Sequence, residues 1–498
     1  MGCRNVGLQI GQAVFRENST AKIAMQTESS TLLRWAVVAL TFVMVVLLGG
    51  CATAHYPVNS ALSKFDPQAG YRMKRFAGEP GDEELLVVLT FSGGGTRAAA
   101  LAYGVLEELS RTPITWRGER KRLLDEVDLV YGVSGGSITA AYWGLHGDRI
   151  FRDFEDAFLG RDFQSQLLEA AVQIPNLWRV TSRRFGRGDL LQERLDAQLF
   201  HGATFADLAA RKRGPMIVIS ATDLSNGARF DFTQDYFDVL CADLSTFPVA
   251  RAVAASSAVP VVFAPISLWN YAGTCGYSPP ALVASAREAP SARRLSESRE
   301  QERARSIAEY LDRAEKPYLH LVDGGLADNL AVRGLLELAD LAERGDPMAS
   351  ASRPLRFRKL LFITVDAGVE TKLQISKSPD TPGFADVIQA LSDIPVDRFS
   401  AETRLLLQAA FEKWRTQPTP SAPQGEVSQI FTAEVSLRSV PDDRQRGLLM
   451  LLPTSLSLPA EDVRKLRAAG GRLLRESSDY QRLLREIGAG SQPPQTQP

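Results

Sequence analysis

The sequence predicts an α/β fold with a mainly parallel central sheet, and three observations support this. Short apolar runs of strand length recur along the chain, each followed by a stretch with the apolar spacing of a helix. The runs are apolar at consecutive positions, which is typical of strands buried on both faces. The chain has 498 residues, 45% of them hydrophobic, which is enough apolar material for a large core. Such alternation predicts parallel β-α-β units, with helices packed around a sheet.

The expected elements follow in chain order within a catalytic domain at residues 81–375. Strands are predicted at 85–91, 127–131, 216–220, 318–322 and 360–365, and helices at 97–109 and 137–145. Residues 270–316 hold Pro and Gly and then a charged, helix-favouring run, so we expect an insertion over the sheet edge. A mostly helical C-terminal extension is expected at 376–488, and a disordered Gln/Pro tail at 489–498.

The charge balance excludes one class of function. The chain carries 57 Lys and Arg against 58 Asp and Glu, a formal net charge of −1, and the two signs are interleaved. A nucleic-acid-binding surface requires clustered basic residues in excess, so nucleic acid is not an expected partner. No acidic cluster predicts a metal loop, and no metal or other cofactor is expected.

The first 50 residues are predicted to be a signal peptide. The uncharged run at 35–48 follows Arg34 and is short for a membrane span, which needs about 20 residues, but it suits the apolar region of a signal. The segment Leu48-Gly49-Gly50-Cys51 resembles the lipobox of bacterial lipoproteins. That resemblance implies a lipid on Cys51 as the mature N-terminus, followed by a tether at 51–80.

The same resemblance implies a location in the cell envelope. Ala52 after the cysteine points to the outer membrane, facing the periplasm, rather than the inner membrane. An uncut membrane anchor is the alternative. The apolar run lies far from Met1, so Met25 is an alternative translation start. If Cys51 carries lipid, Cys241 and Cys275 remain, and an oxidising compartment permits them to pair or leaves them as two buried thiols.

The candidate nucleophile is Ser134, in the segment Gly132-Val133-Ser134-Gly135-Gly136. This segment lies between a predicted strand and a predicted helix, and it matches the Gly-x-Ser-x-Gly nucleophile elbow. A sharp strand-to-helix turn brings backbone segments close together, so Gly132, Gly135 and Gly136 meet its need for positions without a Cβ. The start of the helix also stabilises developing negative charge. A glycine-rich turn that happens to contain serine is the alternative.

The candidate base is Asp323, because the four histidines fit poorly. An acid followed by a histidine after the serine is the usual order in α/β hydrolases. His146 lies about three helical turns beyond Ser134, His201 lies in a polar helix-to-loop segment, and His320 lies within the predicted strand at 318–322. Asp323-Gly324-Gly325 directly follows the strand at 318–322, and strand ends of parallel sheets are where catalytic groups gather. A plain turn is the alternative for this motif.

The segment Ser92-Gly93-Gly94-Gly95-Thr96-Arg97 is the third candidate element. Three successive glycines after a buried strand can direct backbone N–H groups of Gly93, Gly94 and Gly95 at an oxyanion, with help from Arg97. The segment also loosely fits the Gly-x-Gly-x-x-Ala dinucleotide fingerprint, but no acidic residue closes a second strand at the expected distance.

In this order, the three motifs resemble those of the patatin-like phospholipases. The stretches at 221–227 and 255–260 join the resemblance, which covers roughly residues 85–370. It implies a three-layer α/β/α fold with a Ser134–Asp323 dyad that needs no histidine. It also implies hydrolysis of acyl esters of lipids, of the phospholipase A or lysophospholipase type. Ser92 and Ala98 stand where patatins often have Asp and Gly. These differences question whether the substrate and the shape of the loop are those of the family, more than whether the chemistry is the same.

The expected mechanism has Ser134 attacking an ester carbonyl while Asp323 accepts its proton. Residues 167–178 and 259–266 are candidates for an acyl-chain wall, or else core packing, and residues 270–316 are a candidate lid. Two alternatives remain open from the sequence. One is an inactive patatin-fold lipoprotein that serves as a lipid-binding or envelope scaffold. The other is a hydrolase of non-lipid esters or thioesters.

Overall fold

The computed structural model describes residues 59–73, 85–180, 182, 185–211, 214–288, 299–343, 357–368, 379–416 and 428–488. The predicted signal peptide, Cys51 and the tail at 489–498 lie outside these residues, and so does most of the predicted tether. Residues Tyr56–Pro498 form one compact unit. The region at 376–488 is therefore part of the same unit as the predicted catalytic domain.

A central sheet organises this unit, with the strand order β12-β11-β2-β5-β6-β10-β9 and with β7 pairing to β6. The pairings among β12, β11, β2, β5 and β6 are all parallel, whereas β7, β10 and β9 pair antiparallel. The mainly parallel sheet predicted from the sequence is therefore confirmed. Its strands are β2 (Leu85–Phe91), β5 (Val127–Val133), β6 (Met216–Asp223), β7 (Arg229–Asp231), β9 (Ile266–Trp269), β10 (Tyr318–Val322), β11 (Lys359–Asp366) and β12 (Gln429–Ser436).

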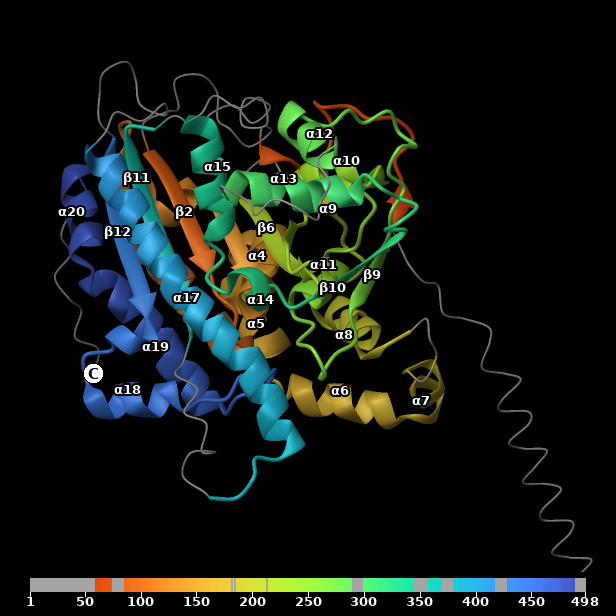
Figure 1. The fold of residues 1–498 in the computed structure, drawn as a ribbon. Coiled ribbons are helices and arrows are strands. Elements are labelled where there is room, and N and C mark those ends of the chain that lie inside the picture. The colour runs from red at the N-terminus through yellow and green to blue at the C-terminus, as the bar shows by residue number, and fades with distance from the viewer. Residues whose placement is uncertain are drawn as a thin grey trace, which may run out of the picture. The chain divides into compact units, whose positions relative to one another are not determined.

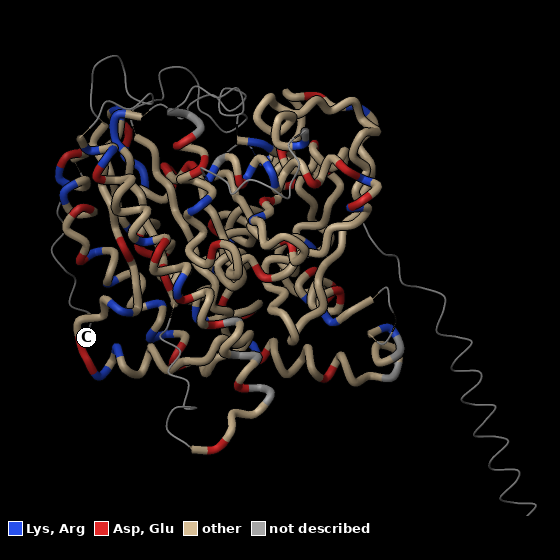
Figure 2. The backbone as a smooth tube through the Cα atoms, in the orientation of Figure 1, with Lys and Arg blue, Asp and Glu red and all other residues tan. Residues whose placement is uncertain are grey.

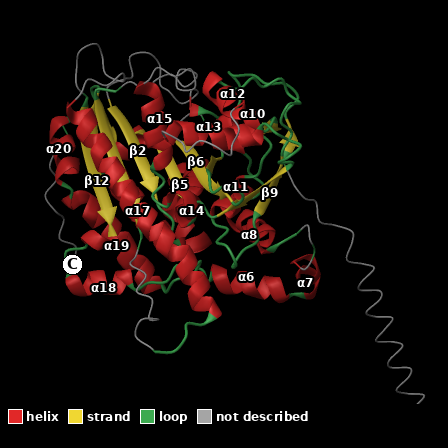
Figure 3. Cartoon of the chain, in the orientation of Figure 1, coloured by secondary structure: helices red, strands yellow, loops and turns green. Residues whose placement is uncertain are grey.

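Helices cover both faces of the sheet, so the fold has three layers (Figure 1). In this view α17 crosses in front of the strands and α19 lies behind them (Figure 3), and α4 also lies behind them (Figure 1). The helices are α3 (Gly95–Arg111), α4 (Gly135–His146), α5 (Ile150–Phe154), α6 (Phe163–Val172), α7 (Ile174–Val180), α8 (Arg187–Leu195), α9 (Phe205–Ala210), α10 (Gln234–Val239), α11 (Val249–Ser256), α12 (Ala281–Glu288), α13 (Arg299–Tyr310), α14 (Gly325–Asp328), α15 (Arg333–Glu343), α17 (Phe384–Thr416), α18 (Asp443–Met450), α19 (Ala460–Glu476) and α20 (Ser478–Glu486).

Shorter elements complete the described part of the chain. Two-stranded ladders join β1 (Ser60–Ala61) to β8 (Ala242–Asp243) and β3 (Pro113–Trp116) to β4 (Glu119–Arg122). Single turns of 3₁₀ or π helix occupy Leu123–Glu126, Gly147–Arg149, Glu155–Leu159, Asp196–Phe200 and Leu437–Ser439. None of the helices described has the length and hydropathy that crossing a membrane requires.

The C-terminal region completes the core, although the sequence predicts it only as a helical extension. β12 pairs along its whole length with β11, from Lys359↔Gln429 to Asp366↔Ser436. α19 packs directly on α3, and a Cβ on Gly104 of α3 would lie 2.1 Å from the Arg467 carbonyl oxygen. Backbone approach this close requires glycine. The helical content is confirmed, but β12 is a strand that sequence patterning missed.

The described part of the predicted tether packs on the fold instead of hanging free. Tyr71 is buried, and its hydroxyl accepts a hydrogen bond of 2.8 Å from the Ile217 amide. Arg72 forms ion pairs of 2.9 Å with Asp235 and with the buried Asp238. Residues 59–73 are thus part of the domain, because buried polar groups of the core are satisfied by this segment.

A disulfide joins Cys241 and Cys275, whose pairing the sequence left open. It connects the loop after α10 to the loop after β9, and both cysteines are buried. The Phe65 amide donates 2.9 Å to the Cys275 carbonyl, so the amino-terminal segment docks on the same corner.

Candidate active site

Ser134 occupies the turn between β5 and α4, as the sequence predicts. Its backbone is left-handed, with φ 51° and ψ −124°, a conformation that non-glycine residues rarely adopt. Strain of this kind at a strand-to-helix turn is typical of a functional residue. A Cβ on the next residue, Gly135, would lie 2.0 Å from the Gly95 carbonyl oxygen, so the elbow fits only without one. The turn is further fixed by the Ser134 amide, which donates 2.8 Å to Ser256 Oγ.

Asp323 follows β10 and meets Ser134 at the same edge of the sheet. β10 runs antiparallel to β6, so the expectation of a parallel strand end was wrong for this strand. The Asp323 backbone is nevertheless held on both sides: its amide donates 3.0 Å to the Ala258 carbonyl, and its own carbonyl accepts 2.9 Å from Thr222 Oγ1. Its carboxylate accepts 2.8 Å from the Gly325 amide and is hydrogen-bonded to the Ser134 side chain.

The electrostatic setting of Asp323 suits a base. Its side chain is 8% exposed, and burial raises its pKa to about 6 against hydrogen bonds from Gly325 and Ser134 that lower it. Burial disfavours the charged carboxylate and so makes it more basic. At neutral pH most of the group is still ionised, and it accepts a proton more readily than an ordinary aspartate.

The glycine loop between β2 and α3 faces the serine. Gly94 has φ 136°, and a Cβ on Gly93 would lie 3.5 Å from the Ser134 Cβ. The Gly93 amide donates 3.0 Å to the Asn329 carbonyl and is therefore occupied. Within the described part of the chain, the Gly94 and Gly95 amides have no hydrogen-bond acceptor. Of the three predicted oxyanion donors, these two are thus the available ones, and their role stays a prediction.

Arg97 anchors this loop from within the protein. It is 2% exposed and donates hydrogen bonds to the carbonyls of Ala367 (2.9 Å) and Leu452 (2.5 Å) and to Thr454 Oγ1 (3.1 Å). Burial lowers its pKa to about 10, against the attraction of Asp366, Asp393 and Asp397, so it stays cationic. These bonds hold the loop and the segment at 452–454 together. Its predicted help to an oxyanion remains untested.

Ser134 and Asp323 open into one cavity of about 130 Å³. Its wall is partly apolar and includes Val259 and Pro260, from one of the two predicted acyl-chain walls. The other lining residues are Gly93, Gly94, Arg97, Gly325, Leu326, Asn329, Gly368, Asp393, Val396, Asp397 and Thr454. This cavity is called the site pocket below.

Comparison with known proteins identifies the domain. The model of the patatin-like phospholipase family matches residues 89–336, a range that contains the glycine loop, Ser134 and Asp323. Residues 89–336 belong to the patatin-like phospholipase family. No curated protein matches the chain.

Two solved structures of human GIVD cytosolic phospholipase A2 are similar to the chain. Both are complexes with methyl gamma-linolenyl fluorophosphonate, one of them also with terbium chloride. Each is 13% identical, with TM-scores of 0.39 and 0.38, and the match covers 84% of this chain. The chain covers 62% of the length of these phospholipase structures, which is less than two thirds.

The patatin-like domain has no histidine among the described residues that line its site pocket. His146 lies at the end of α4 far from Ser134, and its Nε2 is 3.1 Å from the Leu199 carbonyl oxygen. His320 Nδ1 is 2.6 Å from Ser267 Oγ. Both rings are thus engaged elsewhere, as expected from the sequence. The described residues also include no group of three or more His, Cys, Asp or Glu that could hold a metal ion.

The expected lid does not line the site pocket of the patatin-like domain. None of the described residues in 270–316 is among its lining residues, and α13 instead lines a separate cavity of about 210 Å³ with Arg303 and Tyr310. The pocket is bordered instead by Asp393, Val396 and Asp397 of α17. The helix at the mouth therefore comes from the C-terminal region.

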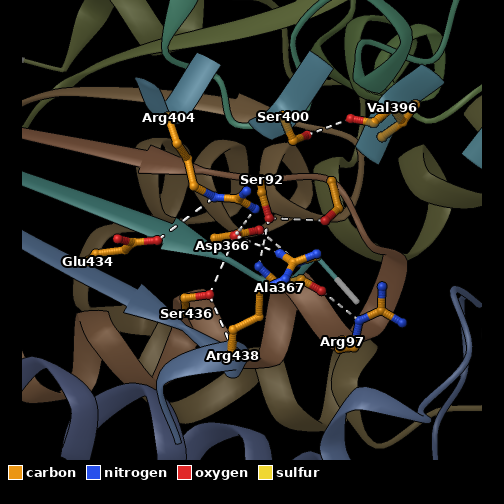
Figure 4. A network of polar contacts seen from close by, with 12 residues as sticks. Ser92, Arg97, Asp366, Ala367, Val396, Ser400, Arg404, Glu434, Ser436 and Arg438 are labelled. Atoms are coloured by element: carbon orange, nitrogen blue, oxygen red, sulfur yellow. Dashed lines mark hydrogen bonds and ion pairs between the residues drawn. The ribbon is translucent and has the colours of Figure 1, made fainter. Parts of the chain in front are cut away.

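A buried polar network connects α17 and β12 to the glycine loop of the patatin-like domain (Figure 4). Asp366, 1% exposed, accepts hydrogen bonds from Arg404 of α17 (2.9 Å) and from Arg438 after β12 (3.3 Å). The next residue, Ala367, donates its amide 2.9 Å to Ser92 Oγ. The C-terminal elements thus fix the end of β11 beside the loop.

Sequence patterning missed two residues that position the patatin-like site. Ser256 Oγ accepts from the Ser134 amide and donates 2.6 Å to the Ser220 carbonyl, which joins the elbow to β6. Asn329 accepts from the Gly93 amide through its carbonyl, and its side chain leaves no room for a Cβ on Gly93. Ser256 falls in the stretch at 255–260 that carries the family resemblance, so that stretch was the available signal. Nothing in the sequence singled out Asn329.

Proposed function

We propose that the chain is a serine acyl hydrolase that cleaves carboxylic esters of membrane lipids, as a phospholipase A or lysophospholipase. The observation that carries the proposal is the hydrogen bond between Ser134 and the buried carboxylate of Asp323, whose pKa is raised to about 6. A weak nucleophile such as serine needs a base within hydrogen-bond reach, and this carboxylate fills that role.

In the first half-reaction, Ser134 Oγ attacks the ester carbonyl carbon while Asp323 accepts the hydroxyl proton. The carbonyl oxygen becomes an oxyanion, for which the Gly94 and Gly95 amides are the available donors. Removal of one such donor from an enzyme costs about 10²- to 10³-fold in rate. The tetrahedral adduct then collapses, the carbon–oxygen bond to the alcohol breaks, and the alcohol leaves with the proton from Asp323.

In the second half-reaction, water attacks the acyl-serine carbonyl. Asp323, again ionised, accepts a proton from the water, and the second tetrahedral adduct breaks its bond to Ser134 Oγ. The serine recovers its proton from Asp323, and the fatty acid is released. One ester and one water thus give one alcohol and one acid, and no cofactor takes part.

We propose an extracytoplasmic location with lipid on Cys51, in the outer membrane facing the periplasm. The disulfide between Cys241 and Cys275 supports this, because disulfides persist in oxidising compartments. Mass analysis of the mature protein would test it: a diacylglyceryl cysteine at residue 51 is expected. An unmodified Cys51 inside an uncut chain would contradict the proposal.

Labelling with a fluorophosphonate tests the dyad. The chain at 52–498, which keeps the whole compact unit, is treated with the probe, and the adduct is located by mass spectrometry. Labelling at Ser134 is expected, with none in Ser134→Ala and about 10²- to 10⁴-fold slower labelling in Asp323→Asn. Ser137→Ala is the matched control: Ser137 lies in the first turn of α4, and its hydroxyl donates to the backbone carbonyl of Ser134 rather than to its side chain, so labelling should persist.

Two outcomes would contradict the proposed dyad. Absence of labelling in a well-folded protein favours the inactive scaffold, and labelling at another serine moves the nucleophile. A series of phosphatidylcholine, lysophosphatidylcholine and acyl-thioester substrates then separates lipid hydrolysis from the hydrolysis of other esters.

A further inference from the structure

Beside the site pocket, whose own lining includes the charged residues Arg97, Asp323, Asp393 and Asp397, lie segments that are poor in charge. Four segments adjoin or line the mouth, and together they are called the apolar rim: residues 163–178, 257–266, 387–396 and 447–459. Within these bounds Glu169 and Asp393 are the only charged residues, although 23% of the chain is charged, and the charged residues Arg179, Asp386, Asp397 and Arg446 directly flank the segments. Figure 2 shows the contrast, since charged residues are spread along most other elements but are sparse along α6.

The apolar rim also exposes large apolar side chains. A soluble protein exposes single apolar residues without consequence, but a cluster of them around one opening marks an interaction site. The most exposed are Leu451 (75%), Val172 (72%), Leu391 (66%) and Leu168 (61%), and the others are Val261, Leu448, Val262, Ile394, Leu177 and Val387.

Contacts in the fold bring the four segments of the apolar rim to the same opening. Val259, Val396 and Thr454, from three of the segments, all line the site pocket. The fourth segment is joined to them by the Leu456 amide, which donates 3.2 Å to Gln164 Oε1 of α6. Figure 1 shows α6, α7 and the beginning of α17 along the lower edge of the view.

α17 presents its amino-terminal part to this opening. From residue 400 onward one face of the helix is buried, and this part is tied down by the Arg404–Asp366 ion pair (Figure 4). Before residue 400, the described side chains of α17 are half-buried or exposed. Val387, Leu391 and Ile394 follow each other at helical spacing, so they share one apolar face. The buried part of α17 after residue 400 thus holds the apolar amino-terminal part of the helix at the mouth of the site pocket.

We propose that the apolar rim docks on a phospholipid bilayer and immerses the start of α17, α6 and the loop at 451 in its surface. The proposal rests on the proposed function, since it names how that site meets its substrate. A protein partner or second copy seated on the rim would close the pocket that opens in its centre, whereas a bilayer supplies ester to that pocket. The scarcity of charge makes burial of apolar side chains, rather than attraction to anionic headgroups, the driving force.

Vesicle binding tests the apolar rim without any catalysis. Chain 52–498 carrying Ser134→Ala is mixed with zwitterionic phosphatidylcholine vesicles, and the bound fraction is measured by flotation at low and high salt. Binding that changes less than twofold with salt is expected. Adding Leu391→Asp and Ile394→Asp should weaken it about 100-fold, because two apolar side chains no longer enter the bilayer.

The matched control is Leu224→Asp. Leu224 is 53% exposed, in the turn between β6 and β7, where the neighbouring Asn226 donates 2.8 Å to Glu309 of α13. This substitution should leave vesicle binding unchanged in the Ser134→Ala protein, and it should leave ester hydrolysis unchanged in the protein that keeps Ser134. Circular dichroism and thermal unfolding of each variant show that a loss of binding is not a loss of fold.

Each outcome decides the proposal. Vesicle binding lost only in the α17 variant supports it. Binding below detection for the parent protein, or equal in all variants, overturns it, and so does concentration-dependent dimerisation that the α17 variant abolishes. The two proposals fail separately: a protein that binds vesicles but takes no label at Ser134 keeps the docking surface and loses the proposed activity.

Discussion

Replacing Asp323 by asparagine removes a buried carboxylate whose ionised form lowers the stability of the folded protein. Burial raises its pKa from the ordinary value of 3.8 to about 6. Each pKa unit corresponds to about 1.4 kcal/mol, so holding the charge above pH 6 costs about 3 kcal/mol of folding free energy. The asparagine side chain would keep the shape of the carboxylate and an oxygen to accept from the Gly325 amide, but it would carry no charge.

The direction in which stability changes with pH follows from how tightly the folded and unfolded chains bind this proton. Between about pH 4 and pH 6 the folded protein holds this proton more tightly than the unfolded chain, so its contribution to stability is complete below pH 4 and is lost as the pH rises through 6. The Asp323→Asn variant has no titrating group at this position. Its stability relative to the parent protein should therefore rise by about 3 kcal/mol between pH 4 and pH 8.

Urea unfolding of both proteins at pH 4 and pH 8 measures this difference. Glu119→Gln, which removes an exposed carboxylate from the β3–β4 hairpin, is measured alongside as the control. A stability difference between Asp323→Asn and the parent that is the same at both pH values would refute the argument, because the carboxylate would then not be perturbed by burial.

The same substitution separates stability from activity. Ester hydrolysis by Asp323→Asn should fall about 10²- to 10⁴-fold while the fold becomes more stable at pH 8. In the parent protein, hydrolysis should decline below pH 6 as the base becomes protonated. Initial rates from pH 4.5 to pH 8 measure this, and a rate that is flat through pH 6 would remove Asp323 from the role of base.

Two further perturbations test the packing. Gly324→Ala places a Cβ 2.3 Å from a β6 carbonyl oxygen and should destabilise the protein by about 2 kcal/mol or more. Gly447→Ala, in open space on α18, should instead stabilise the protein by about 0.5–1 kcal/mol. Urea unfolding measures both changes, and equal effects would contradict the close approach at Gly324. Replacing Cys241 and Cys275 by Ser should lower the free energy of unfolding by about 4 kcal/mol, because the bridge closes a loop over a separation of 34 residues. Labelling at Ser134 should stay intact at 25 °C. A change below about 1 kcal/mol would show that the loop is ordered without the bridge.

The parts of the site that depend on local backbone geometry were predictable from the sequence. A buried strand that turns sharply into a helix requires small residues at fixed positions, so the segments around Gly94, Ser134 and Asp323 carry their geometry in a few consecutive letters. The strands that lead into them were predicted for the same reason, because burial on both faces demands a continuous apolar run.

Other parts were decided only by tertiary structure. β12 was missed because its apolar run is short, is interrupted by Thr432 and Glu434, and lies within a region of helical pattern. The lid was expected in 270–316 because long insertions often cover sites, yet α17 borders the pocket, held there by Arg404 and Asp366.

The disulfide and the raised pKa of Asp323 both depend on tertiary contacts that the sequence does not show. Whether two cysteines lie close enough to pair, or a carboxylate is buried enough to become a base, depends on contacts between residues distant in sequence. Composition and local pattern do not contain those distances. By itself the sequence indicated the candidate site residues, and the fold decided which neighbours surround them, because burial and charge act through space.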